Sequence, residues 1–509
     1  MENRYNLIDE PWIPVADVGK VSLSDIFSAR YRALGGNPVE KIAVLNLLLA
    51  IAQAAYTPRD NEDWESLGEQ GLSEKCLEYL ERWRERFFLY GDKPFLQMPA
   101  IATARTQPYG GVIPFISSGN TTVLNQSNVE KTLEDAEKAL VLITLMNFSL
   151  GGKKPDNYIV LSDSYHGKTN DKEKPATAKP GPSVGSKGLL HSFIIGSSIS
   201  QTVWLNTFTE VELKEVLHQF PSGLGTPPWQ VMPRSENCPI AQSLSESLCG
   251  RLVGLSRFCL LKDNSLHLSE GIPSRSYEEG VVDPSVAMNT EGKEIRVVWA
   301  NPDKRPWREL STLLSFFQHG GGGEYRCLRL ACHVERTARI LPQFSILSGG
   351  LQVSRHATGE QYVTGTNDYV ESLVRLDSSQ LGAIWFAQLR LEMHLMEKIE
   401  KMLYSSVLRY VYVSKNGSKN KKIPKIAKKI AGGATSEFWQ LCERNFQSLV
   451  GSCDANEEAR LARYACRKKF ADYARSVYNQ HCPKETARQM QSWAKNMPKF
   501  GWYLKQEAS

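Results

Sequence analysis

Apolar residues recur at helical spacing in the N-terminal third of the chain and again in its C-terminal quarter. The N-terminal pattern predicts helices at 39–56, 74–88 and 133–148, because apolar positions three and four residues apart share one face of a helix. Beyond Asp377 the same pattern predicts helices at 378–413, 436–450, 456–480 and 483–503. Long helices joined by short connections favour an antiparallel four-helix bundle.

The central half of the chain has a different pattern. Short β-type runs predict strands at 189–195, 202–205, 257–262 and 294–300, and Pro and Gly residues separate these runs. The segment 151–188 is poor in apolar residues and rich in Gly, Pro and Lys. We therefore expect an α+β protein, with a large irregular mixed α/β N-terminal domain over 1–370 and the four-helix bundle over 371–509.

Composition narrows the class of protein. Of the 509 residues, 41% are hydrophobic and 23% charged, and a globular chain of this length buries a large core without disulfides. Its ten cysteines include no Cys-x-x-Cys pair, which favours reduced thiols. The apolar run 42–55 is interrupted by Asn46 and Gln53 and is too short to cross a membrane. With no signal-peptide pattern at its start, the sequence predicts a cytoplasmic protein without a membrane partner.

Charge is distributed unevenly along the chain. The net charge is +6, yet residues 375–509 hold 24 Lys and Arg against 12 Asp and Glu. The rest of the chain is therefore slightly acidic. A strongly basic C-terminal quarter points to a polyanionic partner, most often nucleic acid. The alternative is a solvated helical surface.

Three motifs of common enzymes are absent from the sequence. There is no Walker A loop, no HExxH and no dinucleotide fingerprint. The glycine run 320–323 after His319 lacks the ending of a phosphate-binding loop. Cys327, Cys332 and His333 lie close in sequence, but a second pair of metal ligands is missing. We predict no catalytic residue, no metal site and no cofactor; the alternative is a metal-dependent nuclease or phosphotransfer enzyme built on these residues.

Basic residues form two groups in the C-terminal quarter. The stretch 415–429 carries seven lysines and no acidic residue, and its candidates for phosphate contacts are Lys421, Lys422, Lys425, Lys428 and Lys429. A second stripe contains Arg460, Arg463, Arg467, Lys468 and Lys469. Phosphate contacts release counterions and carry little sequence preference, so these groups suit a nucleic-acid backbone. A solvated helix face explains the second stripe almost as well. A general basic scaffold for RNA or single strands is a further alternative.

A glycine-rich loop, 181–188, precedes the predicted strand 189–195. Its glycines allow the backbone to approach a ligand closely, and Ser183, Ser186 and Lys187 supply hydrogen-bond donors. Taken alone, this pattern fits an ordinary hairpin or loop equally well.

Several segments spread over the chain together resemble one family. They lie at 6–15, 93–99, 120–126, 180–209, 226–230 and 348–357. In sequence, order and spacing they resemble the large subunit of the type I-E CRISPR Cascade surveillance complex, the CasA family, and a helical bundle ends both chains. The resemblance covers nearly the whole length.

This resemblance implies a non-catalytic bacterial subunit that works with the other Cascade subunits and a CRISPR RNA. Such a subunit reads a short flanking motif, the PAM, in double-stranded target DNA, and minor-groove readout suits a few backbone and side-chain donors. It also helps to open the duplex and start the R-loop, holds the non-target strand, and recruits a separate helicase-nuclease. Cleavage then requires no catalytic residue in this chain.

Site residues follow from the resemblance position by position. It implies that the DNA and the PAM are contacted by Asn125, Gln126, Gly181, Ser183, Gly185, Ser186, Lys187 and Arg275. It also implies a wedge hairpin that contains Gly349, Gly350, Gln352, Ser354 and Arg355, with either Gln352 or Arg355 at its tip. We expect Gly349 and Gly350 to permit the tight reversal of this hairpin. The non-target strand is expected to follow Lys421, Lys422, Lys425, Lys428, Lys429, Arg463 and Arg467.

Overall fold

The computed structural model describes residues 2–113, 132–151, 156, 159, 161, 188–273, 275, 277–317, 325–355, 361–364, 368–414 and 425–505. It consists of two compact units. The N-terminal unit comprises Met1–Glu309 and Gly322–Leu373, and the C-terminal unit comprises Leu310–Gly321 and Val374–Ser509. The division at Leu373 lies close to the expected boundary, whereas the inclusion of Leu310–Gly321 in the second unit was not expected.

Small antiparallel sheets make up the strand content of the N-terminal unit. Strand β1 (Arg4–Asn6) pairs with β4 (Phe88–Tyr90), and β2 (Ile13–Val15) pairs with β3 (Gly19–Val21). Two three-stranded sheets have the orders β5 (Thr106–Pro108), β8 (Ser265–Glu270), β7 (Arg257–Leu261) and β10 (Arg296–Val297), β9 (Ala287–Asn289), β11 (Arg326–Cys327).

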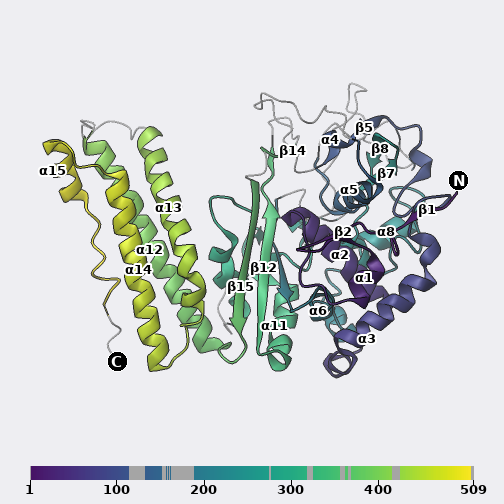
Figure 1. Ribbon diagram of the computed structural model, residues 1–509, viewed down its shortest axis with the longest axis horizontal. Coiled ribbons are helices and arrows are strands. Elements are labelled where there is room, and N and C mark those ends of the chain that lie inside the picture. The colour runs from purple at the N-terminus through teal and green to yellow at the C-terminus, as the bar shows by residue number, and fades with distance from the viewer. Residues whose placement is uncertain are drawn as a thin grey trace. The chain divides into compact units, whose positions relative to one another are not determined.

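A third sheet carries the longest strands. Its order is β15 (Tyr369–Asp377), β12 (Gln343–Leu351), β6 (His191–Ile195), and the hairpin β13 (Ser354–Arg355) with β14 (Gln361–Tyr362) follows β12 along the chain. The central strand β12 pairs antiparallel with β6. Figure 1 shows β12 and β15 as long neighbouring arrows with β14 beyond their upper ends.

Helix α2 (Pro38–Ala55) forms the centre of the N-terminal core. Asn37 caps it by accepting hydrogen bonds from the backbone N–H groups of Val39 and Glu40, and Pro38 occupies its first turn, as is typical of helix starts. The helix is apolar on all sides and packs against α3 (Asn61–Arg82), α5 (Asp135–Asn147), α9 (Leu248–Leu252) and β12. It is the one helix of the described chain that is long and apolar enough to span a membrane, yet 72% of it is buried inside the protein.

Shorter helices surround this core. They are α1 (Leu23–Ser28), α4 (Tyr109–Val112), α6 (Ile199–Leu205), α7 (Glu210–Glu215), α8 (Pro239–Ser245) and α11 (Leu328–Ile340), with the 3₁₀ turns η1 (Arg84–Arg86), η2 (Pro99–Ile101), η5 (Tyr277–Glu279) and η6 (Pro306–Glu309). The expected strand at 202–205 is wrong, because these residues belong to α6. The Ser198 hydroxyl caps that helix by accepting from the Gln201 N–H.

The C-terminal unit is helical. Helix α12 (Ala383–Ser414) packs against α13 (Lys425–Val450), α14 (Glu457–His481) and the short α15 (Ala487–Asn496), and α13 also packs against α14 (Figure 1). The unit also contains α10 (Leu310–Leu313) and η7 (Ser315–Phe317). Several expected bounds are wrong: α12 begins at Ala383 rather than 378, α13 begins at Lys425 rather than 436, and α15 covers Ala487–Asn496 rather than 483–503. Residues 497–505 contain no helix.

Candidate nucleic-acid interface

The end of the glycine-rich loop lies against the start of the predicted wedge. Gly188 has a φ of +76°, and a Cβ there would lie 3.0 Å from the Val353 nitrogen and 3.2 Å from the Leu351 oxygen. A left-handed backbone and this close approach both require glycine. Gly188 and the residues 351–353, more than 150 residues apart in sequence, are therefore brought together at the end of the β6–β12 pair.

Gly349 and Gly350 do not form the turn of the hairpin. Both lie in strand β12, where Gly349 is opposite His191 of β6, and a Cβ on Gly350 would lie 2.6 Å from the Leu189 oxygen. The expected role of these glycines in a tight reversal is therefore wrong. They let two backbones pass closely inside the sheet.

The chain reverses after Arg355 instead. Ser354 pairs with Tyr362, and Arg355 pairs with Gln361. Gln352, just before this hairpin, is half-buried, and its backbone N–H donates to the Asp368 carbonyl at 2.9 Å. The segment predicted as the wedge thus covers the end of β12 and the strand β13, and β13 pairs with β14.

Gln361 ties this hairpin to the beginning of the same glycine-rich segment. Its side-chain oxygen accepts from the Gly151 N–H at 2.8 Å, and its own backbone N–H donates to the Gly151 carbonyl at 2.9 Å. Gly151, at the start of this segment, therefore contacts β14, and Gly188, at its end, lies against residues 351–353. No sequence signal identified Gln361, because a lone glutamine in a short strand has no distinctive spacing.

The segment that contains Arg275 lies close to the same place. The Arg275 carbonyl accepts from Nη2 of the buried Arg251 at 3.0 Å, and the Arg275 guanidinium lies 3.7 Å from Glu279. Tyr277 meets Trp299 edge-on, with ring centroids 5.6 Å apart, and Trp299 forms a β-bridge with Leu189. Trp299 is 45% exposed, so it adds an aromatic side chain to this surface that sequence reasoning missed.

Other predicted contact residues are not described by the structure. Outside the described residues lie Asn125, Gln126, Gly181, Ser183, Gly185, Ser186, Lys187, Lys421 and Lys422. Their assignment stays a prediction.

Lys425, Lys428 and Lys429 lie exposed in the first turns of α13. The first turn contains no acidic residue. Positive charge at a helix N-terminus opposes the helix dipole, at a cost of a few tenths of a kcal/mol or more. Helix stability therefore does not explain these lysines, and their contact with DNA stays a prediction.

Arg463 and Arg467 correct the predicted basic stripe. Both are buried: Arg463 Nη1 donates to the carbonyls of Ser452 and Asp454, and Arg467 pairs with Glu392 of α12. The expectation that these two residues hold a DNA strand is wrong, because their guanidinium groups bond inside the helical unit. Arg460 is half-buried and pairs with Glu457 at the surface.

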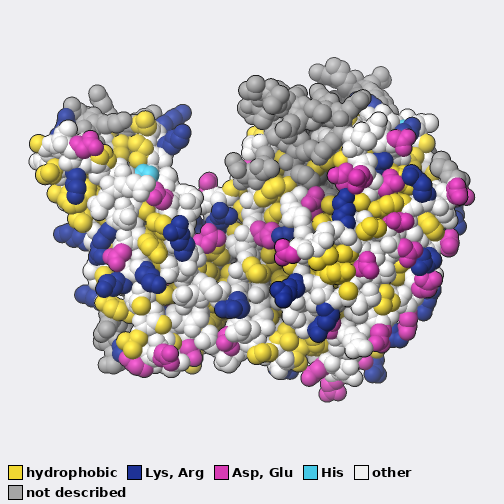
Figure 2. Space-filling model, viewed as in Figure 1, with side chains coloured by type: hydrophobic (Ala, Val, Ile, Leu, Met, Phe, Trp, Pro, Cys, Tyr) yellow, Lys and Arg dark blue, Asp and Glu magenta, His cyan; other side chains and the backbone are white. Residues whose placement is uncertain are grey.

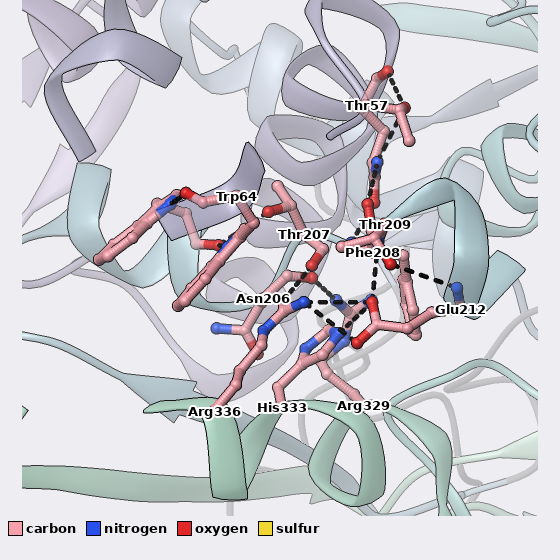
Figure 3. A network of polar contacts seen from close by, with 12 residues as sticks. Thr57, Trp64, Asn206, Thr207, Phe208, Thr209, Glu212, Arg329, His333 and Arg336 are labelled. Atoms are coloured by element: carbon pink, nitrogen blue, oxygen red, sulfur yellow. Dashed lines mark hydrogen bonds and ion pairs between the residues drawn. The ribbon is translucent and has the colours of Figure 1, made fainter. Parts of the chain in front are cut away.

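Cys327, Cys332 and His333, the basis of the enzyme alternative, belong to a buried structural region. Burial raises the pKa of both thiols to about 12, which disfavours the thiolate that metal binding needs. Arg336, His333 and Arg329 project from α11 toward Glu212 and the backbone of 206–209 (Figure 3). Within the described residues, no group of three or more His, Cys, Asp or Glu is placed to hold a metal ion.

This polar network also explains one of the resembling segments. Arg336 Nη1 lies 3.1 Å from each Glu212 oxygen, and Arg329 donates to the Asn206 carbonyl. The Asn206 side chain in turn bonds the backbone of Ile194 in β6, accepting at 3.1 Å and donating at 2.6 Å. Asn206 therefore fixes the strand that follows the glycine loop.

Comparison with known proteins places the chain in a family. The family model described as CRISPR-associated protein Cse1 matches residues 6–477. The CRISPR-associated protein CasA/Cse1 of Thermus thermophilus is 34% identical over 164 residues, which make up 29% of this chain and 32% of that protein. That match spans about a third of the relative's length.

Solved structures share the fold over the whole chain. The crystal structure of CasA from Thermus thermophilus has a TM-score of 0.71 at 18% identity and covers 98% of this chain and 99% of its own. A chain of a CRISPR RNA-guided surveillance complex has a TM-score of 0.66 at 13% identity, with 97% and 98% covered. Because the family model spans nearly the full sequence, the chain belongs to the CRISPR-associated Cse1 (CasA) family.

Proposed function

We propose that this protein is the non-catalytic large subunit of a type I-E CRISPR RNA-guided surveillance complex in the bacterial cytoplasm. It reads the PAM in duplex DNA, helps to open the duplex and start the R-loop, holds the non-target strand, and recruits the helicase-nuclease. Its partners are the other Cascade subunits, the CRISPR RNA and double-stranded target DNA. The family membership and the fold shared with a surveillance-complex chain support this proposal.

One observation carries the DNA-reading part. Three segments that the resemblance assigns to DNA contact converge at the end of the β6–β12 pair: Gly188 at the end of the glycine loop, the Arg275 segment through Trp299, and the hairpin β13–β14. Backbone donors and one or two side chains suffice for the degenerate code of the minor groove. The adjoining hairpin is then positioned beside the first base pair to be opened.

Opening the duplex needs no catalytic group. Wedge side chains that intrude beside a base step cost a few kcal/mol of unstacking, which extra protein contacts offset. Pairing with the guide RNA then replaces the lost DNA pairs in a near-balanced exchange. The C-terminal helices, proposed as an antiparallel bundle with a short fourth helix, supply positive charge for the displaced strand through Lys425, Lys428 and Lys429.

Duplex binding by the reconstituted complex, measured over a randomised flanking motif, tests this function. Arg275→Gln should reduce the preference for the best flank, because a base-edge contact adds about 1–3 kcal/mol of discrimination. Arg82→Gln, an exposed arginine on α3, is the matched control. Equal losses on preferred and scrambled flanks would reject the assignment of Arg275, and a parent complex with no flank preference would reject PAM reading altogether.

A further inference from the structure

A groove runs along the C-terminal unit between α12 and the chain that follows α15. Its volume is about 720 Å³, within the range of about 300–1,000 Å³ typical of sites for nucleotide-sized ligands. Five cationic side chains line it: Lys398, Lys401, Arg409, Lys495 and Lys499. The described residues contribute no acidic side chain to this lining.

Helix α12 forms one wall of the groove. Lys398, Lys401 and Arg409 share one face of the helix, because they stand at positions i, i+3 and i+11. Leu403 and Val407 on the opposite face are fully buried. From Lys398 to Arg409 the helix rises by about 17 Å, so the cations form a track rather than a single anion site.

The end of α15 and the residues that follow it form the other wall. Phe500 and Tyr503 are buried, and Arg475 and Arg467 lie over their rings at 5.8 and 5.9 Å from the centroids. These two anchors fix the chain that carries Lys499 and Trp502. The half-buried Trp502 therefore lines the groove as a fixed aromatic side chain.

The groove cations form no ion pair or hydrogen bond with any residue that the structure describes. Elsewhere on the same unit, Arg460 pairs with Glu457 and Arg475 with Asp472. Basic side chains are spread over the visible face of this unit, whereas acidic ones are most frequent toward its lower end (Figure 2). Several unpaired cations facing one groove repel each other, and an anionic ligand relieves this repulsion.

We propose that this groove binds a single strand of nucleic acid, with phosphates on the lysines and a base against Trp502. Sites for single strands combine a basic track with an aromatic side chain on which a base stacks, and lysine binds phosphate as a point charge. Arg409 lies near the end of α12, and the lysine-rich stretch 415–429 follows directly in the sequence. The site does not depend on PAM reading by the N-terminal unit.

Fluorescence anisotropy of the full chain with a fluorescein-labelled oligo-dT, titrated at several salt concentrations, tests the proposal. The triple variant Lys398→Gln, Lys401→Gln, Lys499→Gln should weaken binding about tenfold or more. It should also reduce the slope of log affinity against log salt by about 2, since each single-strand phosphate contact contributes about 0.7. The triple Arg375→Gln, Arg444→Gln, Lys484→Gln removes equal charge from exposed positions outside the groove lining and should change affinity less than threefold. Equal losses in the two triples would overturn the proposal.

Substitution of Trp502 provides a second test, whose outcome does not depend on charge. Trp502→Leu should weaken oligo-dT binding about tenfold with an unchanged salt slope, and Trp502→Phe should recover most of it, because stacking needs an aromatic face. A thermal melt of each variant shows whether the tail stays folded. Full affinity in a folded Trp502→Leu variant would show that no base stacks on Trp502.

A fluorescein-labelled acidic peptide with the same number of charges distinguishes a protein partner from a nucleic acid. It should bind at least tenfold more weakly than oligo-dT. If it binds equally well and the groove triple weakens it equally, the groove is a docking site for an acidic protein segment and the proposal is wrong. In the reconstituted complex the groove triple should keep its flank preference, so this proposal and PAM reading succeed or fail separately.

Discussion

Arg467 on α14 and Glu392 on α12 form an ion pair inside the C-terminal unit. The Arg467 Nε lies 3.1 and 3.0 Å from the two carboxylate oxygens, and the exposed fractions of the two side chains are 8% and 0%. The pair joins two helices that are distant in sequence. Removal of one member leaves the other charge buried without its partner, which is strongly destabilising.

Arg467→Ala should therefore lower the free energy of unfolding by about 3–5 kcal/mol. Urea denaturation of the full chain, followed by far-UV circular dichroism, measures this loss. Arg460→Ala is the control, because Arg460 forms an exposed pair with Glu457 that contributes about 0–1 kcal/mol. A stable Arg467→Ala variant with weakened DNA binding would instead support the original prediction that Arg467 contacts the DNA strand.

Gly350→Ala should disturb the contact between strand β12 and Leu189, which directly follows the glycine loop. The added methyl group would lie 2.6 Å from the Leu189 oxygen and 3.0 Å from the Ala300 Cβ, so backbone must shift, at a cost of about 1–3 kcal/mol. We expect a lower melting temperature and a weaker flank preference in the assembled complex. Gly382→Ala, where nothing lies within 4 Å of the new Cβ, should leave both unchanged. Equal melting temperatures for the two variants would contradict the close approach.

Much of the N-terminal core could be predicted from the sequence, because local signals agree with the packing there. The apolar pattern at 39–56 predicted a helix, and α2 covers Pro38–Ala55. Two of the resembling segments, 93–99 and 226–230, meet in space: the rings of Phe95 and Trp229 lie 6.1 Å apart.

The sequence-based predictions were wrong where neighbouring side chains determine whether a residue is buried or exposed. Spacing placed Arg463 and Arg467 on one face of a helix, but charge suggested that this face was exposed. The same face carries Cys466, Phe470 and Ala474, all buried, and this apolar stripe indicated that the arginines point inward. Gly349 and Gly350 show a similar limit, since glycine serves a tight turn and a close backbone approach equally well.

His333 should make the protein less stable in mild acid. Burial and the charge of Arg336 lower the pKa of His333 from 6.5 to about 3, so below about pH 6.5 the His333 imidazole is protonated in the unfolded chain but stays neutral in the folded chain. Stability is therefore full above about pH 6.5 and falls as the pH drops toward 3. Between pH 7.5 and 5 this loss amounts to about 2 kcal/mol.

The variant His333→Phe should lack this loss while keeping the ring contact with Phe208, whose centroid lies 4.6 Å away. Unfolding free energies measured between about pH 5 and 7.5 should fall less steeply than those of the parent. The exposed His218, changed to Phe, is the matched control. Glu212 contributes little in this range, because its ordinary pKa of 4.5 confines most of its titration in the unfolded chain to lower pH. Parallel profiles for the parent and His333→Phe would contradict the buried neutral ring.

The lysine cluster should contribute charge rather than sequence information, since phosphate contacts carry no base code. Neutralising Lys421, Lys422, Lys425, Lys428 and Lys429 together should flatten the salt dependence of target binding by the complex. The flank preference should survive. An unchanged slope of log affinity against log salt would show that the cluster does not contact DNA in the measured complex.

The hairpin β13–β14 should act on duplex opening more than on first encounter. Its base is held by backbone bonds and by Gln361, so changing Gln352, Ser354 and Arg355 together to alanine leaves that framework in place. Unstacking a base step costs a few kcal/mol, and we expect the triple variant to form R-loops more slowly on fully paired targets. A target already mismatched between its two DNA strands beside the PAM should bypass the defect, because its opening cost has been removed. Stopped-flow measurements on the two targets, with parent and variant complexes, compare these rates. A variant that is equally slow on both targets would show that the hairpin is a structural turn of the N-terminal unit and not a wedge.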